Sequence, residues 1–323
     1  DRLANGQQVL LLQNRRGYSP VLLCPDCGWV PECRNCDIAM TYHKKSATLI
    51  CHYCNLHETP PAVCPRCKGS NFLYPGVGTQ KVEYYLKTAF PDCRYERLDL
   101  DASRIRERAP RVLKQFEEGQ IQLLIGTQMI AKGLDFPNVT LVGVINADLG
   151  LYLPDFRARE RVFQLLYQVS GRAGRGDIQG EIIIQTYNPQ DFTIRCALQQ
   201  NLAGFSNFEL NERNPLNYPP FSRMALIQVS DLNNQRAATT AGAVADFLNA
   251  RRGKIELLGP AVAPLARLLN RYRYQIILKS RREKDPNGRI LHQLLSNFLN
   301  SREYRELSRQ ARITIDIDPL DLL

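Results

Sequence analysis

The sequence lacks the features of several protein classes. No apolar run approaches the roughly 20 residues that cross a bilayer, and the N-terminus has no signal-peptide pattern, so we expect a soluble, cytoplasmic protein without membrane contacts. Internal repeats and low-complexity tracts are also missing, which argues against a repeat architecture. The chain begins at Asp1 rather than at an initiator Met, close to an apolar run, and we expect it to be part of a larger polypeptide.

Size and charge set the next limits. With 323 residues, of which 44% are hydrophobic, the chain exceeds one ordinary core, and two or three domains are expected. Its 42 Lys and Arg residues against 32 Asp and Glu residues give a formal charge of +10. This balance favours polyanionic partners. Many basic proteins bind no nucleic acid, however, so the charge is informative only where motifs concentrate it.

Cysteine is concentrated in one segment that has almost no apolar periodicity. Eight of the ten cysteines form four C-x-x-C pairs: Cys24/Cys27, Cys33/Cys36, Cys51/Cys54 and Cys64/Cys67. Eight thiolates complete two tetrahedral zinc sites with no open position, so both zinc ions should be structural. Disulfides are the alternative, but the chain has no secretory signal and leaves Cys93 and Cys196 unpaired. A redox motif would need one pair at a helix start.

The order of the pairs leaves two ways to share the metals. The inner pairs flank a hairpin-like segment from Met40 to Leu49, which predicts that Cys33, Cys36, Cys51 and Cys54 hold one zinc ion and that the outer pairs hold the other. Sequential pairing, first with second and third with fourth, is the rival. Because eight thiolates fill both sites, three histidines are expected to be bystanders: His43, His52 and His57.

The remaining sequence predicts two α/β units. Apolar strands alternate with amphipathic helices, which indicates a parallel sheet covered on both faces. The expected strands are 9–12, 21–23, 94–98, 121–126, 139–146 and 181–186, with helices at 105–118 and 155–170. From about Pro219 the pattern β-α-β-β-α-β is typical of a ferredoxin-like fold, with strands at 224–230, 256–258, 272–279 and 312–317 and helices at 236–250 and 291–299.

Two motifs of the first unit carry chemistry. From Leu124 to Pro137 a buried strand enters a turn of Gly, Thr, Lys and Asp residues, the place where open α/β sheets bind ligands. From Gln168 to Gly176 a helix runs into a glycine-flanked pair of arginines, whose planar guanidinium groups suit phosphate oxygens. Taken separately, these residues could form an ordinary turn and a solvated helix end. In this order they resemble motifs V and VI of superfamily 2 helicases.

The succession of motifs resembles the family of bacterial primosomal helicases known as PriA or primosomal protein N′. Its elements here are N-R-R-G-Y at 14–18, the four cysteine pairs, G-V-G-T at 76–79, G-T-Q-M-I-A-K-G-L-D-F-P at 126–137 and Q-V-S-G-R-A-G-R at 168–175. The resemblance implies a RecA-like second helicase lobe at 1–23 and 72–190, with an inserted two-zinc cysteine module at 24–71. A helical linker at 191–218 and a C-terminal domain at 219–323 then follow.

The resemblance also implies residue roles. Arg172 and Arg175 would stabilise charge on the γ-phosphate of ATP, with Gly133, Asp135 and Gln168 beside the nucleotide. Thr127 and Thr79 would hold DNA phosphates. Arg15 and Arg16 would contact the DNA backbone, a solvated basic loop being the alternative. In the family the whole enzyme unwinds DNA with 3′ to 5′ polarity at abandoned replication forks and takes part in primosome assembly.

A missing motif limits this reading. The chain contains neither G-x-x-x-x-G-K-[ST] nor an acidic D-E-x-H box, and the segment beginning at Asp148 does not substitute for one. ATP and Mg²⁺ are therefore expected in the full-length enzyme, while this fragment alone is expected to be inactive. The alternative is a non-catalytic zinc-ribbon module that binds nucleic acid or protein. A helicase-like topoisomerase or an RNA helicase is a third option.

A basic strand suggests one partner. Between Asn270 and Gln275, Arg271, Arg273 and Gln275 fall on one face and the two tyrosines on the other. Family members engage the acidic C-terminal tail of single-stranded DNA-binding protein. We therefore expect Arg271 and Gln275 to help to hold its carboxylate, the alternative being a purely structural strand. Forked and single-stranded DNA and other primosome proteins are the remaining expected partners.

Overall fold

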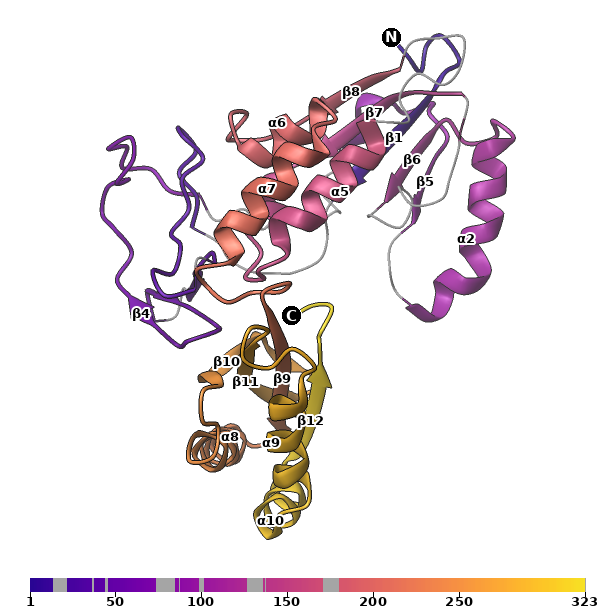
Figure 1. Ribbon diagram of the computed structural model, residues 1–323. Coiled ribbons are helices and arrows are strands. Elements are labelled where there is room, and N and C mark those ends of the chain that lie inside the picture. Colours follow the sequence, from indigo (N-terminus) through magenta and orange to yellow (C-terminus); the bar gives the residue numbers. More distant parts are fainter. Residues whose placement is uncertain are drawn as a thin grey trace.

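The computed structural model describes residues 1–13, 22–36, 38–43, 46–73, 85–86, 88–98, 102–126, 136, 138–170 and 180–322. The chain forms a parallel sheet with its helices, a cysteine-rich module beside it and an antiparallel sheet below (Figure 1). Within the described part, no helix has the length and apolar character of a membrane span.

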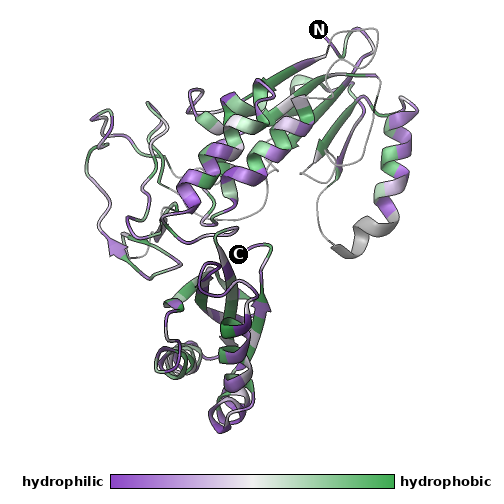
Figure 2. Cartoon of the chain, viewed as in Figure 1, coloured by the Kyte–Doolittle hydropathy of each residue, from purple (hydrophilic) through white to green (hydrophobic). Residues whose placement is uncertain are grey.

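The parallel sheet has five strands in the order β5-β6-β1-β7-β8, and every neighbouring pair is parallel. Its strands are coloured mainly as hydrophobic in Figure 2, and all four residues of β6 are buried, as expected for a sheet covered on both faces. The parallel α/β arrangement predicted from the sequence is confirmed. The strands are β1 (Gln8–Gln13), β5 (Tyr95–Leu98), β6 (Leu123–Gly126), β7 (Val139–Ile145) and β8 (Glu181–Ile184).

The helices whose bounds are described beside this sheet are α2 (Ala102–Glu117), α4 (Asp148–Leu151), α5 (Ala158–Ser170), α6 (Phe192–Leu198) and α7 (Leu202–Arg213). The sequence predicted a helical linker at 191–218, and α6 and α7 lie within it. Ile194, Ala197 and Phe205 are buried in the same core as the sheet, and the ring of Phe205 stacks on that of Phe163 with centroids 3.9 Å apart. α6 and α7 therefore belong to the first unit because their apolar faces complete its core.

Two other expectations for this unit need correction. Leu23 forms only an isolated bridge with Leu73 rather than part of a strand, and Val21 lies outside the described residues. The helix expected from Asp155 begins at Ala158, because the Asp155 carboxylate accepts a hydrogen bond from the Arg157 backbone N–H at 2.8 Å in the preceding turn.

The C-terminal unit is an antiparallel sheet in the order β10-β11-β9-β12, which with its helices is the ferredoxin-like arrangement predicted. The structure adds a helix, α10, before the last strand. It also extends the second strand to Leu268, because two irregularities in register accommodate its prolines. The elements are β9 (Ser222–Asp231), α8 (Asn234–Asn249), β10 (Glu256–Leu268), β11 (Arg271–Arg281), α9 (Arg289–Leu299), α10 (Arg302–Gln310) and β12 (Arg312–Ile317).

The two faces of this antiparallel sheet have different coverings. Helices α8 and α9 pack their apolar side chains against one face. The other face packs against the cysteine module, whose small sheet consists of β2 (Thr41–His43), β3 (Thr48–Ile50) and β4 (His57–Glu58). Met224, Leu226 and Ile277 share one buried cluster with module residues that include Cys36 and Tyr53. The module and the C-terminal sheet therefore form a common core.

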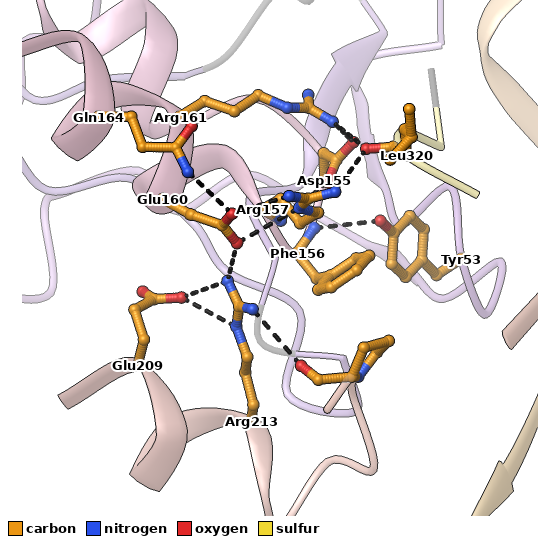
Figure 3. A network of polar contacts seen from close by, with 11 residues as sticks. Tyr53, Asp155, Phe156, Arg157, Glu160, Arg161, Gln164, Glu209, Arg213 and Leu320 are labelled. Atoms are coloured by element: carbon orange, nitrogen blue, oxygen red, sulfur yellow. Dashed lines mark hydrogen bonds and ion pairs between the residues drawn. The ribbon is translucent and has the colours of Figure 1, made fainter. Parts of the chain in front are cut away.

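A partly buried network of charges joins α5, α7 and the residues near the chain end (Figure 3). Arg213 Nη2 lies 2.8 Å from Glu160 and 2.7 Å from Glu209, and Arg157 Nη2 lies 2.8 Å from Glu160. Burial alone would raise the pKa of Glu160, but hydrogen bonds from Arg157 and Arg213 hold it below its ordinary value. For Glu209 burial dominates, and its pKa is raised despite Arg213. Arg213 thus neutralises two neighbouring carboxylates.

The residues near the end of the chain are held by α5 and by the turn that precedes it. Arg157 and Arg161 both donate to the carbonyl oxygen of Leu320, at 3.2 and 3.0 Å. The Leu322 backbone N–H donates to Asp155 at 3.1 Å, and the Leu322 side chain is fully buried in the core shared with the cysteine module. The last residues therefore tie the C-terminal sheet to the first unit.

Changing Arg213 to Met tests the network. The variant leaves Glu160 and Glu209 close together without their shared cation, and we expect a loss of about 3 kcal/mol of unfolding free energy at pH 7. The pKa of Glu209, which burial already raises, would then lie further above the unfolded value, whereas Glu160 would keep Arg157 as a partner. The variant should therefore regain part of its stability as pH falls from 7 to 5, and its gap from the parent should narrow.

Denaturant unfolding at pH 7 and pH 5 measures the difference in unfolding free energy between the parent and the Arg213→Met variant. Arg302→Met is a matched control, because Arg302 is exposed and pairs only with Glu306 one turn away, so its removal should leave stability nearly unchanged. An Arg213→Met variant as stable as the Arg302→Met variant at pH 7 would contradict the role assigned to the network.

Candidate metal centres

In the described residues, three of the four C-x-x-C pairs occupy tight turns with a common hydrogen-bond pattern. The backbone N–H groups of Gly28, Asn55 and Lys68 each donate, at 2.9 Å, to the carbonyl oxygen of the cysteine four residues earlier. All three residues have φ between 61° and 71°, the left-handed conformation that allows such a turn. The turn brings both sulfurs of a pair to the same side, as a metal site requires.

Gly28 also sets the approach of the module to the first unit. A Cβ atom at this position would lie 2.5 Å from Asn188 Cβ, and the carbonyl oxygen of Gly28 accepts a hydrogen bond from the Tyr152 hydroxyl at 3.1 Å. The first cysteine turn is thus packed directly on the helicase-like unit. Only a residue without a side chain fits this contact.

The outer pairs meet in one cluster. The sulfurs of Cys24, Cys27, Cys64 and Cys67 all lie within 4.8 Å of one another, with Cys24 Sγ 3.5 Å from Cys67 Sγ and Cys27 Sγ 3.7 Å from Cys64 Sγ. These distances exceed the roughly 2.05 Å of a disulfide bond. They approach the edge of about 3.8 Å that four sulfurs form around zinc at a Zn–S distance of about 2.3 Å.

The inner pairs meet in a second cluster of the same kind. Cys33, Cys36, Cys51 and Cys54 have their sulfurs within 4.8 Å of one another, and Cys33 Sγ lies 3.6 Å from Cys54 Sγ. Three of these cysteines are buried, at 1% exposure or less, whereas the outer cluster includes the exposed Cys67. The structure therefore groups outer with outer and inner with inner, the grouping predicted from the sequence.

In the outer cluster the pKa of one thiol is raised and that of another is lowered. Desolvation, the largest cause, raises the pKa of Cys27 to about 12. At Cys64 desolvation acts in the same direction, but backbone N–H groups of Cys67 and Arg66 outweigh it and lower the pKa to about 7. A divalent cation lowers the pKa of each ligating thiol and so favours four thiolates together. The donor set and its spacing both fit zinc.

The histidines expected to be bystanders have other contacts. Nδ1 of His52 lies 2.7 Å from the carbonyl oxygen of Val262 in β10, and burial lowers the pKa of this ring to about 4. Nε2 of His57 lies 3.3 Å from Asn55 Oδ1, and the His43 ring packs edge-on against His52. Among the described residues, the groups able to hold a metal consist of cysteine alone.

Most of the predicted nucleotide and DNA contacts fall outside the described residues: Arg15, Arg16, Thr79, Thr127, Gly133, Asp135, Arg172 and Arg175. The strand before Arg15 and Arg16, β1, and the strand before Thr127, β6, both lie within the described residues. Parallel β1 and β6 pair Leu12 with Gly126, so both strands run toward the same edge of the sheet. Gln168 is half-buried in α5, two residues before the helix ends at Ser170.

Asp148 has a structural role. Its carboxylate accepts hydrogen bonds from the Thr186 hydroxyl and the Tyr187 backbone N–H, both at 3.0 Å, and its side chain is almost completely buried. Burial raises its pKa. Through these two bonds Asp148 holds the segment after β8 against α4.

The prediction for Gln275 is corrected. Its side chain is completely buried, and its Nε2 donates to the carbonyl oxygen of His52 at 2.9 Å, so it joins β11 to the cysteine module instead of facing a partner. Arg271 is half-exposed at the start of β11. The strand alternation was predicted correctly, but the face that carries Gln275 is covered by the module.

Sequence reasoning missed the residues that seat the inner cluster. The Tyr218 hydroxyl donates to the carbonyl oxygen of Cys36 at 2.9 Å, and its ring stacks on Phe156. Lys279 Nζ lies 4.3 Å from the centre of the Tyr218 ring and donates to the Leu216 carbonyl oxygen at 3.0 Å. A buried lysine in the middle of an apolar strand was the available signal, since such a charge needs partners.

Paired cysteine substitutions distinguish the two groupings. We expect the parent chain to hold two zinc ions. A Cys24→Ser/Cys64→Ser variant should keep one ion under a zinc chelator, because both changes fall on the same site. A Cys24→Ser/Cys33→Ser variant damages both sites and should lose both ions at that chelator concentration. Metal analysis after dialysis gives the counts.

Cys93→Ser is the control, since Cys93 lies in neither cluster, and it should keep both ions. The rival sequential pairing makes the opposite forecast for the two double variants. One zinc ion retained by Cys24→Ser/Cys33→Ser, and none by Cys24→Ser/Cys64→Ser, would contradict the grouping in the structure.

Three family models match the chain. A primosomal protein N C-terminal domain covers residues 214–320, a PriA DNA helicase Cys-rich region covers 33–58, and a helicase conserved C-terminal domain covers 74–177. The Cys-rich match contains all four inner cysteines and none of the outer ones. A solved structure of the C-terminal domain of the DEAD-box protein Dbp5 is 20% identical, covers 41% of this chain and 67% of that one, and has a TM-score of 0.27, too low to add to the assignment.

Curated relatives match nearly the whole chain. Replication restart protein PriA of Bacillus subtilis (strain 168) is 43% identical over 320 residues, which are 99% of this chain and 39% of that protein. Replication restart protein PriA of Haemophilus influenzae is 38% identical over 321 residues, 99% of this chain and 43% of that protein. The chain thus spans less than half the length of both relatives. Over the part that it spans, the chain belongs to the PriA family of replication restart proteins.

Proposed function

We propose that this chain is the C-terminal portion of an ATP-dependent DNA helicase that acts in replication restart and primosome assembly. The observation that carries the proposal is the 43% identity to a replication restart protein over 99% of the chain. DNA as substrate is supported by the description of the Cys-rich family model as part of a DNA helicase. Translocation with 3′ to 5′ polarity is proposed from the family resemblance.

The parallel sheet supports a role as the second motor lobe. β1 and β6 run to the same edge, where bound ligands meet open α/β sheets. The chain continues from these strands into the segments that contain Arg15, Arg16 and Thr127, which we propose as DNA contacts together with Thr79. Gly133, Asp135 and Gln168 are proposed to border the nucleotide, and Arg172 and Arg175 to meet its γ-phosphate.

The missing phosphate-binding motif bears on which part of the full-length enzyme holds ATP. No G-x-x-x-x-G-K-[ST] occurs in the sequence, so we propose that ATP and Mg²⁺ are held mainly by another part of the full-length enzyme. The chain alone would then supply arginines without a complete ATP site and would be inactive as an ATPase.

We propose the domain division 1–23 with 72–213 for the lobe, 24–71 for the cysteine module and 214–323 for the C-terminal domain. It differs from the sequence-based division because α6 and α7 pack into the core of the lobe. Two structural zinc ions in the module would hold it against both neighbours. A cytoplasmic location follows from a role at replication forks.

Single-stranded DNA-binding protein and other primosome proteins are the proposed protein partners. Arg271 is half-exposed and carries a fixed positive charge, so it suits the carboxylate of an acidic peptide tail. Gln275 is excluded from this contact by its burial against His52.

Replacing Arg172 or Arg175 by Ala in the longer protein tests the motor assignment. Because each guanidinium would stabilise transition-state charge on the γ-phosphate, ATP turnover should fall by about 10³-fold or more. Equilibrium DNA binding should change little. DNA-stimulated hydrolysis and DNA affinity are measured on the same preparations.

Arg309→Ala is a suitable control, because Arg309 lies in the last turn of α10 in the C-terminal unit, and it should retain full turnover. Unchanged ATP turnover in the Arg172 and Arg175 variants would favour the alternative of a non-catalytic zinc-ribbon module. If the Arg172 and Arg175 variants lose DNA binding while each bound complex still hydrolyses ATP at the parent rate, the arginines are nucleic-acid ligands and the motor assignment fails.

A further inference from the structure

The β10–β11 hairpin ends in an unusual turn. Leu268 pairs with Arg271, so the connection consists of two residues, Leu269 and Asn270. Both have positive φ, 49° and 62°. A two-residue hairpin turn with both central residues in this conformation favours Asn, Asp or Gly, because a larger side chain places its Cβ too close to the backbone. Asn270 fits this preference and Leu269 does not.

Solvation also disfavours leucine here. Leu269 is 88% exposed, the highest value among the exposed large hydrophobic residues of the described part. Leu268 is 47% exposed and Leu265 is 42% exposed. The tip therefore presents adjoining apolar side chains to solvent in a backbone conformation that costs free energy. Strain of this kind is common where a residue makes a contact outside the fold.

The apolar tip is flanked by positive charge. Arg267 and Arg271 lie on the two strands next to the turn, and the Arg267 guanidinium sits 5.2 Å from the centre of the Tyr272 ring. Neither arginine is in an ion pair recorded for the described residues. Asp231, the residue opposite Tyr272 in β9, is already paired with Arg236 at 3.1 Å. Both cationic groups can therefore meet an external anion.

The base of the hairpin is held firmly. Val262 in β10 and Gln275 in β11 contact the ring nitrogen and the carbonyl oxygen of His52 in the cysteine module, at 2.7 and 2.9 Å. The final pair between β11 and β9 is Tyr272 with Asp231, so the tip extends beyond the end of β9. A convex, anchored tip can enter another molecule but offers no concave pocket for a small ligand.

We propose that the β10–β11 tip is a wedge that packs its leucine side chains against bases at the branch point of forked DNA. Leu269, with Leu268, would pack against the last base pair or an unpaired base, while Arg267 and Arg271 hold the flanking phosphates. Leucine side chains that insert between bases beside cationic residues are a known mode of DNA distortion. The inference rests on the proposed function only for the identity of the nucleic acid as branched DNA.

The substitution Leu269→Asn tests the wedge without endangering the fold. Asn suits the positive φ of this turn, so the unfolding midpoint should be unchanged or higher. The affinity for forked DNA should fall about tenfold, because Asn removes the apolar contact of the wedge with the base, and that for unbranched duplex should not change. With 2-aminopurine at the fork junction, the fluorescence rise on binding should shrink, and Leu269→Phe should restore it.

Arg267→Gln tests the flanking charge separately from Arg271, which is also proposed to bind a protein tail. It should weaken binding to every DNA tested and reduce its salt dependence by about one ion. All variants are measured in the zinc-bound 323-residue chain and in the longer protein.

Each outcome has a distinct meaning. If the parent chain binds forks and Leu269→Asn binds them equally with the same 2-aminopurine signal, the wedge is refuted while the proposed function stands. If neither the parent chain nor the longer protein binds DNA, the proposed function fails with it. If Leu269→Asn keeps its DNA affinity but loses affinity for an acidic tail peptide, the tip is a protein-binding surface and the wedge is refuted.

Discussion

The packing of the cysteine module against the C-terminal sheet is the contact on which the arrangement of this chain depends. The inner cluster of the module shares a core with Met224, Leu226 and Ile277, and the module adds its own apolar side chains Ile38, Met40, Leu49 and Tyr53. One face of the sheet is covered by its helices and the other by the module. The inner sulfurs are therefore held by tertiary contacts as well as by the zinc expected between them.

The same module links both units of the chain. Its first turn packs at Gly28 against Tyr152 of the helicase-like unit, while His52 and Cys36 contact the C-terminal unit through Gln275 and Tyr218. The residues near the end of the chain add a second connection between the units, because Arg157 and Arg161 donate to the Leu320 carbonyl oxygen and the Leu322 N–H donates to Asp155. The β10–β11 hairpin is bonded to the module at His52, so the module contacts both the first unit and this hairpin.

The sequence was sufficient where local chemistry determines structure. Alternating strands and helices predicted the parallel sheet, and the C-x-x-C spacing with the intervening hairpin predicted which sulfurs meet. It failed where the answer depends on contacts between units. Gln275 alternates correctly along its strand, yet only the fold reveals that the module covers its face. Likewise, the apolar positions of α6 and α7 gave no sign of which core they would join.

The central claim, that the metal-bound module holds the two units together, is tested most directly by hydrogen exchange before and after zinc removal. With a chelator, exchange should accelerate in the module and also in β9 and β11, whose second face would lose its cover. Amides of α8, on the opposite face of the sheet, should stay protected. Faster exchange confined to residues 24–67, with β9 and β11 unchanged, would contradict the account.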